Sequence, residues 1–283
     1  MATVKPARNC IPLKAVTDAF SKMPKKSAAH RDGWTWELLR DAAQTPSTAA
    51  LLRKFAEHFS NGALPQDLWA YLASALLYPF HKKLPEERVS ATDPALRPVT
   101  VGSVLTRFGC RVMVRMNRVA VAAELLLSHQ FSFGINGGVQ QVILACNIAL
   151  EINPSWVMLD LDSKNAHTFC SRERLEEELE LNVAYHYMLE SFRALYGKTV
   201  TVQWHFGNGP DRPATSFHMS CEGLRQGDAP ATVYFNVLAA RVYRKQLRIL
   251  DGRGALFAVA DDVKLLGCKS AQYDDMWKRD KLE

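Results

Sequence analysis

The sequence lacks the cysteine spacing that a zinc knuckle or a small disulfide scaffold requires. Its six cysteines are scattered, and the closest two, Cys146 and Cys170, are 24 residues apart (170 − 146). No pair can therefore form the CxxC half-site of a zinc knuckle. Disulfide scaffolds are also short and dense in cysteine, which this chain is not. We expect all six thiols to be free, in a reducing compartment.

The sequence also lacks a run that is long and apolar enough to cross a membrane. Residues 125–150 form the longest stretch without Asp, Glu, Lys or Arg, but a Gly-Gly pair and several polar residues interrupt it. The N-terminal residues MATVKPARN have no apolar core, so no secretory signal is expected. With 48% hydrophobic and 23% charged residues, the composition excludes disordered and fibrous classes. The 283 residues suffice for one large domain or two smaller ones.

Positive charge is concentrated in the first half of the chain. Residues 1–118 hold 18 Lys or Arg against 9 Asp or Glu, a balance of +9. The remaining residues hold 17 against 20, a balance of −3, and the two sum to the net charge of +6. A basic segment is typical of a surface that binds nucleic-acid phosphates, and acidic clusters can hold hard cations. A solvated basic surface is an equally good interpretation of the charge alone.

One predicted helix in this basic half carries a row of arginines. The pattern predicts a helix over residues 103–127, along which four arginines recur at spacings of 4, 4 and 3. Their guanidinium groups then share one helix face and repel one another unless an anion lies opposite. Nucleic-acid phosphate fits this face, and a solvated surface is the alternative. The four residues are Arg107, Arg111, Arg115 and Arg118.

Alternation and helical spacing predict the remaining elements. The first half contains predicted helices over 13–22, 34–43 and 49–59, a buried strand over 73–81 and an extended segment over 96–99. The second half contains predicted strands over 156–162 and 200–206, the second of which opens a hairpin that ends near Cys221. Helices are predicted over 172–196 and 231–247, and two final strands over 255–260 and 263–266.

Three aspartates are predicted to converge at the ends of strands. Asp261 and Asp262 lie at the tip of the last hairpin, where two adjacent like charges raise a pKa or require a cation. Asp162 ends another strand, 99 residues earlier (261 − 162). If the strands are neighbours, the carboxylates form a site for one or two Mg²⁺ ions that can activate a 3′-oxygen for phosphoryl transfer. Solvated turn residues are the alternative, and Asp160 is interpreted as a bystander.

Six sequence blocks, in this order, resemble those of the reverse transcriptases of non-LTR retrotransposons, especially the site-specific elements. The blocks are KSAAHRDGWTWELL (26–39), LRPVTVGSVLTRFGCRV (96–112), QFSFGINGG (130–138), LDLDSKNAHTFCSR (159–172), GLRQGDAPATVYFN (223–236) and FAVADD (257–262). Each block alone is a weak signal, whereas the ordered series is strong.

The resemblance implies a fold, an activity and a set of partners. The fold would be α+β, a polymerase right hand with helical fingers over 1–155 and an antiparallel palm sheet over 156–283, without a thumb. The activity would be RNA-directed DNA polymerisation on an RNA template with a DNA primer and dNTPs, in the nucleus, with no membrane association. Further segments of a retrotransposon polyprotein would accompany it.

The resemblance also implies roles for individual residues. Asp162, Asp261 and Asp262 would be the catalytic carboxylates and hold two Mg²⁺ ions, with Mn²⁺ as a substitute. The incoming nucleotide would contact four residues, Arg97, His167, Gln226 and Gly227. The nucleic acid would contact Lys83 and the four arginines Arg107, Arg111, Arg115 and Arg118.

Several positions depart from the family pattern. His167 replaces an aromatic ring that packs against the sugar and excludes a 2′-hydroxyl, so selection for deoxynucleotides is open. Val259 stands where tyrosine or phenylalanine is common, and the lysine-bearing palm block and the thumb are missing. Two alternatives therefore stay open: a truncated, degenerate copy that only binds nucleic acid, and a palm related to RNA-dependent RNA polymerases.

Overall fold

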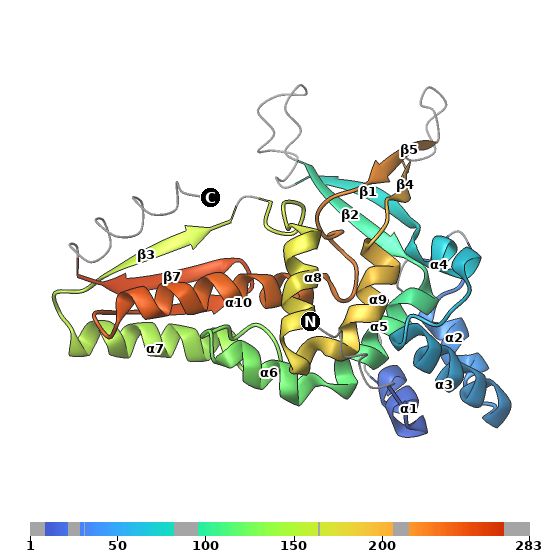
Figure 1. Cartoon of the computed structure of the whole chain (residues 1–283), viewed down its shortest axis with the longest axis horizontal. Helices are drawn as coiled ribbons and strands as arrows, with labels where there is room; N and C mark the ends of the chain where they lie inside the picture. The colour runs from blue at the N-terminus through green and yellow to red at the C-terminus, as the bar shows by residue number, and fades with distance from the viewer. Residues whose placement is uncertain are drawn as a thin grey trace.

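The chain folds into a mixed arrangement of helices and two largely antiparallel sheets, which confirms the α+β class (Figure 1). The computed structural model describes residues 9–21, 29–30, 32–81, 96–163, 165–205 and 215–268. The three-stranded sheet and the helices that cover it form one end of the molecule. Most of the remaining helices gather around the four-stranded sheet at the other end. The names fingers and palm stay predictions for these two parts.

The first sheet has four strands in the order β2-β1-β4-β5. They are β1 (Ala75–His81), β2 (Leu96–Gly102), β4 (Val200–His205) and β5 (Thr215–Ser220). The β1–β2 and β4–β5 pairs are antiparallel, whereas β1 and β4 are parallel. The hairpin predicted over 200–221 is confirmed. This hairpin pairs with β1, so the four-stranded sheet contains strands from both sides of residue 155. The predicted division into domains after residue 155 therefore does not coincide with a division between the sheets, and it stays a prediction.

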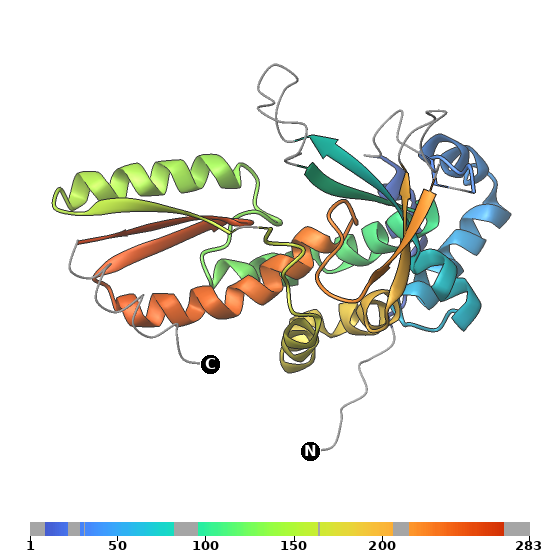
Figure 2. The same ribbon diagram turned by 90° about the horizontal axis from the view of Figure 1, so that it is seen from above.

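The second sheet has three antiparallel strands in the order β3-β7-β6. They are β3 (Val157–Asp162), β6 (Gly254–Val259) and β7 (Asp262–Gly267), close to the predicted runs. Helix α7 (Gly138–Ile152) packs on one face and α10 (Ala231–Leu250) on the other (Figure 2). Alternate residues of β7 face these two helices: Leu266 contacts the α7 side, and Leu265 the α10 side.

The remaining helices pack in two groups. Their bounds are α1 (Leu13–Ser21), α2 (Trp36–Ala42), α3 (Pro46–Ser60), α4 (Gln66–Ala73), α5 (Val104–Met116), α6 (Arg118–Leu126), α8 (Arg172–Leu181) and α9 (His186–Tyr196). Helices α1, α2, α3 and one face of α5 share a core of their own, and the others contribute to the larger core. Local signals start several of them, since the side chains of Thr35, Thr45, Ser103 and Ser171 cap their N-termini. Fully buried aromatic side chains, among them Phe59, Phe108 and Tyr234, fill the core. No helix of the described residues is long and apolar enough to cross a membrane.

Two predicted helices are each divided in the structure. The helix predicted over 103–127 breaks at Asn117, whose backbone leaves the helical region (φ −119°, ψ 15°) between α5 and α6. The helix predicted over 172–196 breaks at Asn182, whose side chain accepts a hydrogen bond from Ala184 and starts a 3₁₀ turn before α9. Asparagine favours such local bonds over a continuing helix. The sequence patterns did not identify α4 or α7, and α7 is apolar on several faces, so that it lacks a clear stripe.

Candidate active site

Asp162 and Asp262 lie directly opposite each other on the antiparallel strands β3 and β7. Directly opposed residues of an antiparallel pair project from the same face of the sheet, so the two carboxylates are neighbours. Asp261 occupies the tight turn between β6 and β7 and is half-buried, whereas Asp162 and Asp262 are exposed. The predicted adjacency of the two strands is therefore confirmed, and the catalytic role of the three residues stays a prediction.

The chemistry of these side chains suits a hard divalent cation. Carboxylate oxygens are the donors that Mg²⁺ prefers, and two like charges placed opposite each other destabilise the sheet unless a cation lies between them. Within the described residues, however, no group of three or more His, Cys, Asp or Glu side chains is arranged closely enough to hold a metal. Asp162 and Asp262 therefore form a pair of opposed carboxylates without a third gathered ligand, and their binding of a metal stays a prediction.

Asp160 has a partner of its own on the same face of the sheet. Its carboxylate accepts a 2.7 Å ion-pair contact from the Lys264 ammonium, directly across the β3–β7 ladder. Hydrogen bonding to Asp160 raises the pKa of Lys264, and the charge of Asp262 adds to this effect. The bystander interpretation of Asp160 agrees with this pairing, because Lys264 already compensates its charge.

Gln130 holds the turn that carries Asp261. Its buried side-chain amide donates to the carbonyl oxygen of Ala260 over 3.0 Å, and its amide oxygen accepts from the Ala260 N–H over 2.9 Å. Ala260 has a left-handed backbone (φ 55°), which is strained for a residue with a Cβ. The backbone around Gln130 also bonds to β6, since Phe131 donates to Ala258 over 2.7 Å. Both backbone groups of this strained residue are thus satisfied from a distant segment.

His167 lies between the carboxylates and the loop of residues 223–228, which is here called the Gln-Gly loop. Its ring stacks on Phe235 of α10 with centroids 5.4 Å apart, and its carbonyl oxygen accepts from Leu224 over 2.7 Å. Burial lowers the pKa of His167, and the nearby charge of Asp261 partly opposes that shift. The lowered pKa favours the neutral ring, which lies close enough to Asp261 to feel its charge, and the contact of His167 with a nucleotide stays a prediction.

The Gln-Gly loop is bonded to strand β2. The carbonyl oxygen of Gln226 accepts from both the backbone N–H and the hydroxyl of Thr100, over 2.6 and 2.9 Å. Gly227 has φ +105°, and a Cβ there would lie 2.4 Å from the Thr100 carbonyl oxygen, so this position requires glycine. The close neighbour that requires this glycine is β2, and the contact of Gly227 with a nucleotide stays a prediction.

A cleft of about 180 Å³ opens beside Gln226. Pro98 and Thr100 of β2 form one wall, and Thr168 and Leu224 contribute to the other. Arg97 precedes Pro98 on the same strand and is exposed to solvent. Gln226 borders this cleft and Gly227 lies against Thr100 of the same strand, whereas Arg97 is not among the residues that line the cleft. The nucleotide contacts of these residues stay predictions, and Lys83 lies outside the described residues.

The predicted row of arginines is not a row of free charges. The guanidinium group of Arg107 lies 5.4 Å from the centre of the Trp36 ring. Burial lowers the pKa of Arg107, and the negative charge of Asp32 partly opposes that shift. Burial also lowers the pKa of Arg111. Arg115 donates to the Asp18 carbonyl oxygen, and Arg118, on the next helix, donates to Gly134 over 3.2 Å.

The prediction of one continuous, unpaired stripe was therefore wrong. The helix breaks at Asn117, and contacts within the molecule already use several of these side chains. Their contact with nucleic acid stays a prediction.

The residues that sequence reasoning missed hold the predicted site residues in place. Gln130, Arg172, Arg225 and Asp228 all lie inside the blocks that carry the resemblance, but no role was assigned to them. Arg225 and Asp228 flank Gln226 and Gly227 in the sequence, and that adjacency is a signal that could have pointed to them. Gln130 and Arg172, in contrast, lie far along the chain from Asp261 and Gln226. Their partners, such as Tyr196, are distant in the chain, and no local pattern identifies them.

No sequence-family model matches this chain, and no curated protein matches it. The structural neighbours are telomerases at low identity. Telomerase from Candida tropicalis, truncated from the C-terminal domain, matches with 13% identity and a TM-score of 0.47 over 71% of this chain and 45% of that one. Telomerase from Candida albicans, in complex with a fragment of telomeric RNA, matches with 14% identity and a TM-score of 0.45 over 75% of this chain and 40% of that one. The chain thus spans less than half the length of these neighbours.

Proposed function

We propose that this chain is the fingers and palm part of an RNA-directed DNA polymerase of the non-LTR retrotransposon type. The observation that carries the proposal is the placement of Asp162 opposite Asp262 on β3 and β7, beside the turn that holds Asp261. These are the aspartates of the two sequence blocks that correspond to the catalytic blocks of that family. The RNA template, the DNA primer, the dNTPs and the accompanying polyprotein segments are parts of the same proposal.

The carboxylates of this site suit nucleotidyl transfer. Asp162 and Asp262, with Asp261 next to them, would hold the divalent cations, for which they provide hard oxygen ligands. Bound Mg²⁺ supplies charge neutralisation to the attacking 3′-oxygen and to the leaving pyrophosphate. Gln130 fixes the turn, so that Asp261 does not have to be ordered when the substrate binds.

The junction beside the carboxylates suits the nucleotide. Arg97 is exposed on β2 and carries a guanidinium group that can pair with the triphosphate. The neutral His167 ring, held against Phe235, would lie against the sugar. Gln226 borders the cleft from the opposite side. The nucleotide would therefore be held between β2 and the Gln-Gly loop.

Primer extension on an RNA template tests the proposal. The intact chain is expected to extend the primer with dNTPs in Mg²⁺, and Asp162→Asn or Asp261→Asn is expected to reduce the rate at least about a hundredfold. Asp160→Asn is the matched control, because it removes a carboxylate from the same strand face but pairs with Lys264. Equal loss in all three variants, or extension that needs none of these carboxylates, would contradict the proposal.

One observation favours a second candidate, a remnant that binds nucleic acid without catalysis. Within the described residues the three aspartates do not form a closed metal-ligand group. A remnant would bind RNA with an affinity that falls steeply with salt and is unchanged by Asp261→Ala or by Mg²⁺. An active polymerase would lose Mg²⁺-dependent nucleotide binding in the same variant.

The third alternative, an RNA-dependent RNA polymerase palm, rests on His167. An imidazole is smaller than a phenyl ring, so that a 2′-hydroxyl is excluded less strictly. Comparison of dNTP with NTP incorporation on one primed template separates this alternative from the first. His167→Phe is expected to shift the preference further toward dNTPs.

A further inference from the structure

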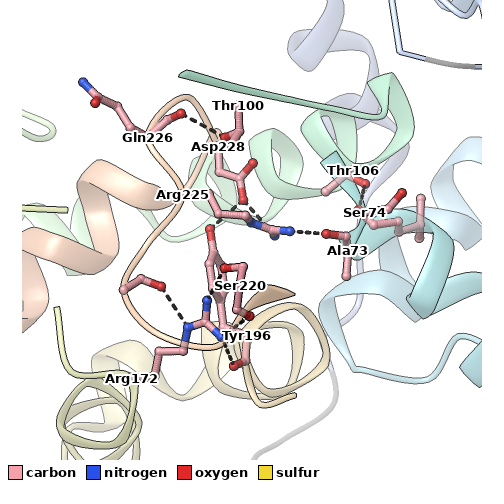
Figure 3. Close-up of polar contacts among 12 residues, drawn as sticks. Ala73, Ser74, Thr100, Thr106, Arg172, Tyr196, Ser220, Arg225, Gln226 and Asp228 are labelled. Atoms are coloured by element: carbon pink, nitrogen blue, oxygen red, sulfur yellow. Dashed lines mark hydrogen bonds and ion pairs between the residues drawn. The ribbon is translucent and has the colours of Figure 1, made fainter. Parts of the chain in front are cut away.

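A buried ion pair lies inside the Gln-Gly loop (Figure 3). The Arg225 guanidinium contacts the Asp228 carboxylate over 2.8 Å, and the two side chains are only 5% and 6% exposed. The hydroxyl of Tyr196 donates to the same carboxylate over 2.6 Å. The Arg225 guanidinium also lies over the Tyr196 ring, 4.8 Å from its centre. Burial alone would lower the pKa of Arg225, but Asp228 and Tyr196 outweigh it and the pKa is raised. Arg225 therefore keeps its positive charge inside the molecule.

Stability alone does not account for such a pair. Removing charges from water costs several kcal/mol per ion, and a buried pair is often no better than apolar side chains of the same volume. A buried pair restricts the conformation of its surroundings, because a conformation that separates the two charges leaves each of them buried without a partner.

The pair connects three segments that are distant in the sequence. Arg225 donates a hydrogen bond to the carbonyl oxygen of Ala73, at the C-terminus of α4 and just before β1. Tyr196, the other partner, ends α9. A second arginine holds the beginning of the loop: Arg172 donates to Gly223 over 2.8 Å and to the Ser220 hydroxyl over 2.8 Å. The loop is thus held at both ends by guanidinium groups.

Gln226 and Gly227 lie between the two members of the pair. With Arg225 and Asp228 fixed, the Gln226 carbonyl oxygen meets the two donors of Thr100. Figure 3 shows the Gln226 side chain pointing away from the ion pair, so the Gln226 amide is not part of the contacts between Arg225 and Asp228. Gln226 is one of the residues that line the cleft, together with Pro98 and Thr100 of β2. The pair therefore determines which way Gln226 faces.

We propose that Arg225 and Asp228 are positioning residues that hold the Gln226 side chain toward an incoming nucleotide and lock the Gln-Gly loop to the strand that carries Arg97. The nucleotide part of this inference rests on the function proposed above. The pair touches no substrate. It acts through the Gln226 and Gly227 backbone, and its loss is expected to weaken nucleotide binding more than template binding.

Three variants separate a positioning role from a role in stability alone. Asp228→Asn keeps the shape and removes one charge, whereas Arg225→Lys keeps the charge and loses the planar fork. The double variant Arg225→Met with Asp228→Leu replaces the pair by apolar side chains, which restores much of the stability that a single substitution loses. The matched control is Arg174→Lys on the exposed Arg174–Glu177 pair of α8.

The expected result in polymerisation is a split between the two substrates. In each of the three variants of the Arg225–Asp228 pair, the KM for the nucleotide should rise about tenfold or more, while the KM for the primed template changes less than about twofold. The double variant should unfold at nearly the wild-type denaturant concentration and still show the raised nucleotide KM. A double variant that regains both stability and nucleotide KM would overturn the proposal, since the pair would then act through stability alone.

Amide hydrogen exchange tests the lock independently of activity. In the wild-type chain the Thr100 amide, which donates to Gln226, should be protected. Asp228→Asn and the double variant should accelerate its exchange at least about tenfold, with little change in α3. Unchanged exchange at Thr100 would overturn the lock, whatever the activity. A wild-type chain that incorporates no nucleotide but shows this acceleration would contradict the proposed function and leave the lock supported.

Discussion

The side chain of Gln130 bonds to both backbone groups of Ala260, the residue immediately before Asp261. The two residues are 130 positions apart in the chain, and the two bonds measure 3.0 and 2.9 Å. The Tyr243 hydroxyl adds a 3.3 Å bond to the same Ala260 carbonyl oxygen. The Gln130 amide therefore satisfies the N–H and the carbonyl oxygen of Ala260, which have no partner within the turn between β6 and β7. These bonds fix the backbone of the residue directly before Asp261.

Replacing Gln130 by leucine should destabilise the chain and impair the site together. The substitution leaves the half-buried N–H of Ala260 without its amide partner, which costs up to about 1–3 kcal/mol of unfolding free energy. Denaturant unfolding measures that loss, and Mg²⁺-dependent primer extension should fall in the same variant. Gln140→Leu, on the exposed side of α7, is the control and should change neither quantity. A Gln130 variant of wild-type stability would contradict the role of these bonds.

The neutral state of His167 should make stability depend on pH. Burial places its folded-state pKa below the unfolded value of 6.5, with Asp261 opposing the shift. As the pH falls, the unfolded chain therefore binds the proton first. The stability linked to neutral His167 is present above pH 6.5 and is lost as the pH falls through the folded-state pKa.

Thermal unfolding between about pH 7.5 and pH 5 measures this dependence. The midpoint should fall with pH more steeply in the wild-type chain than in His167→Gln. An equal slope in wild-type and His167→Gln chains would show that this ring does not titrate as inferred.

Gly227→Ala should be more damaging than Gly252→Ala. Both glycines have positive φ, +105° and +74°, so either alanine brings backbone strain of about 1–3 kcal/mol. At Gly252 a Cβ meets nothing within 4 Å, whereas at Gly227 it would lie 2.4 Å from the Thr100 carbonyl oxygen. The difference in unfolding free energy between the two variants therefore isolates the contact with β2. Equal losses would argue against this close approach.

The thiols should divide into fast and slow classes toward a maleimide. Cys10 and Cys221 are exposed and should be modified first. Burial raises the pKa of Cys170 to about 12 and that of Cys110 well above its usual value, so both should react slowly in the folded chain. Peptide mass mapping after a short exposure distinguishes the classes, and all cysteines should react in denaturant. Fast labelling of Cys170 would contradict its place in the core.

Local patterns in the sequence were sufficient for much of the fold around the aspartates. The alternation over 156–162 and the two apolar runs around Asp261 and Asp262 predicted β3, β6 and β7 nearly to their ends. Strand periodicity depends on which face each side chain covers, and that information lies in neighbouring residues. The strand end at Asp162 and the hairpin tip at Asp261 and Asp262 added the expectation that the carboxylates converge if the strands are neighbours, and Asp162 does lie opposite Asp262 on β3 and β7.

The sequence by itself thus determined the α+β class, the strands and the position of the aspartates in them. Only the tertiary structure decided that β4 pairs with β1, that Arg107 lies against Trp36, and that Arg225, Asp228 and Tyr196 form one buried cluster. These relationships join residues whose separation along the chain leaves no periodic signal. They depend on which surfaces bury each other and on which charges lose their water, and packing of the whole chain sets both.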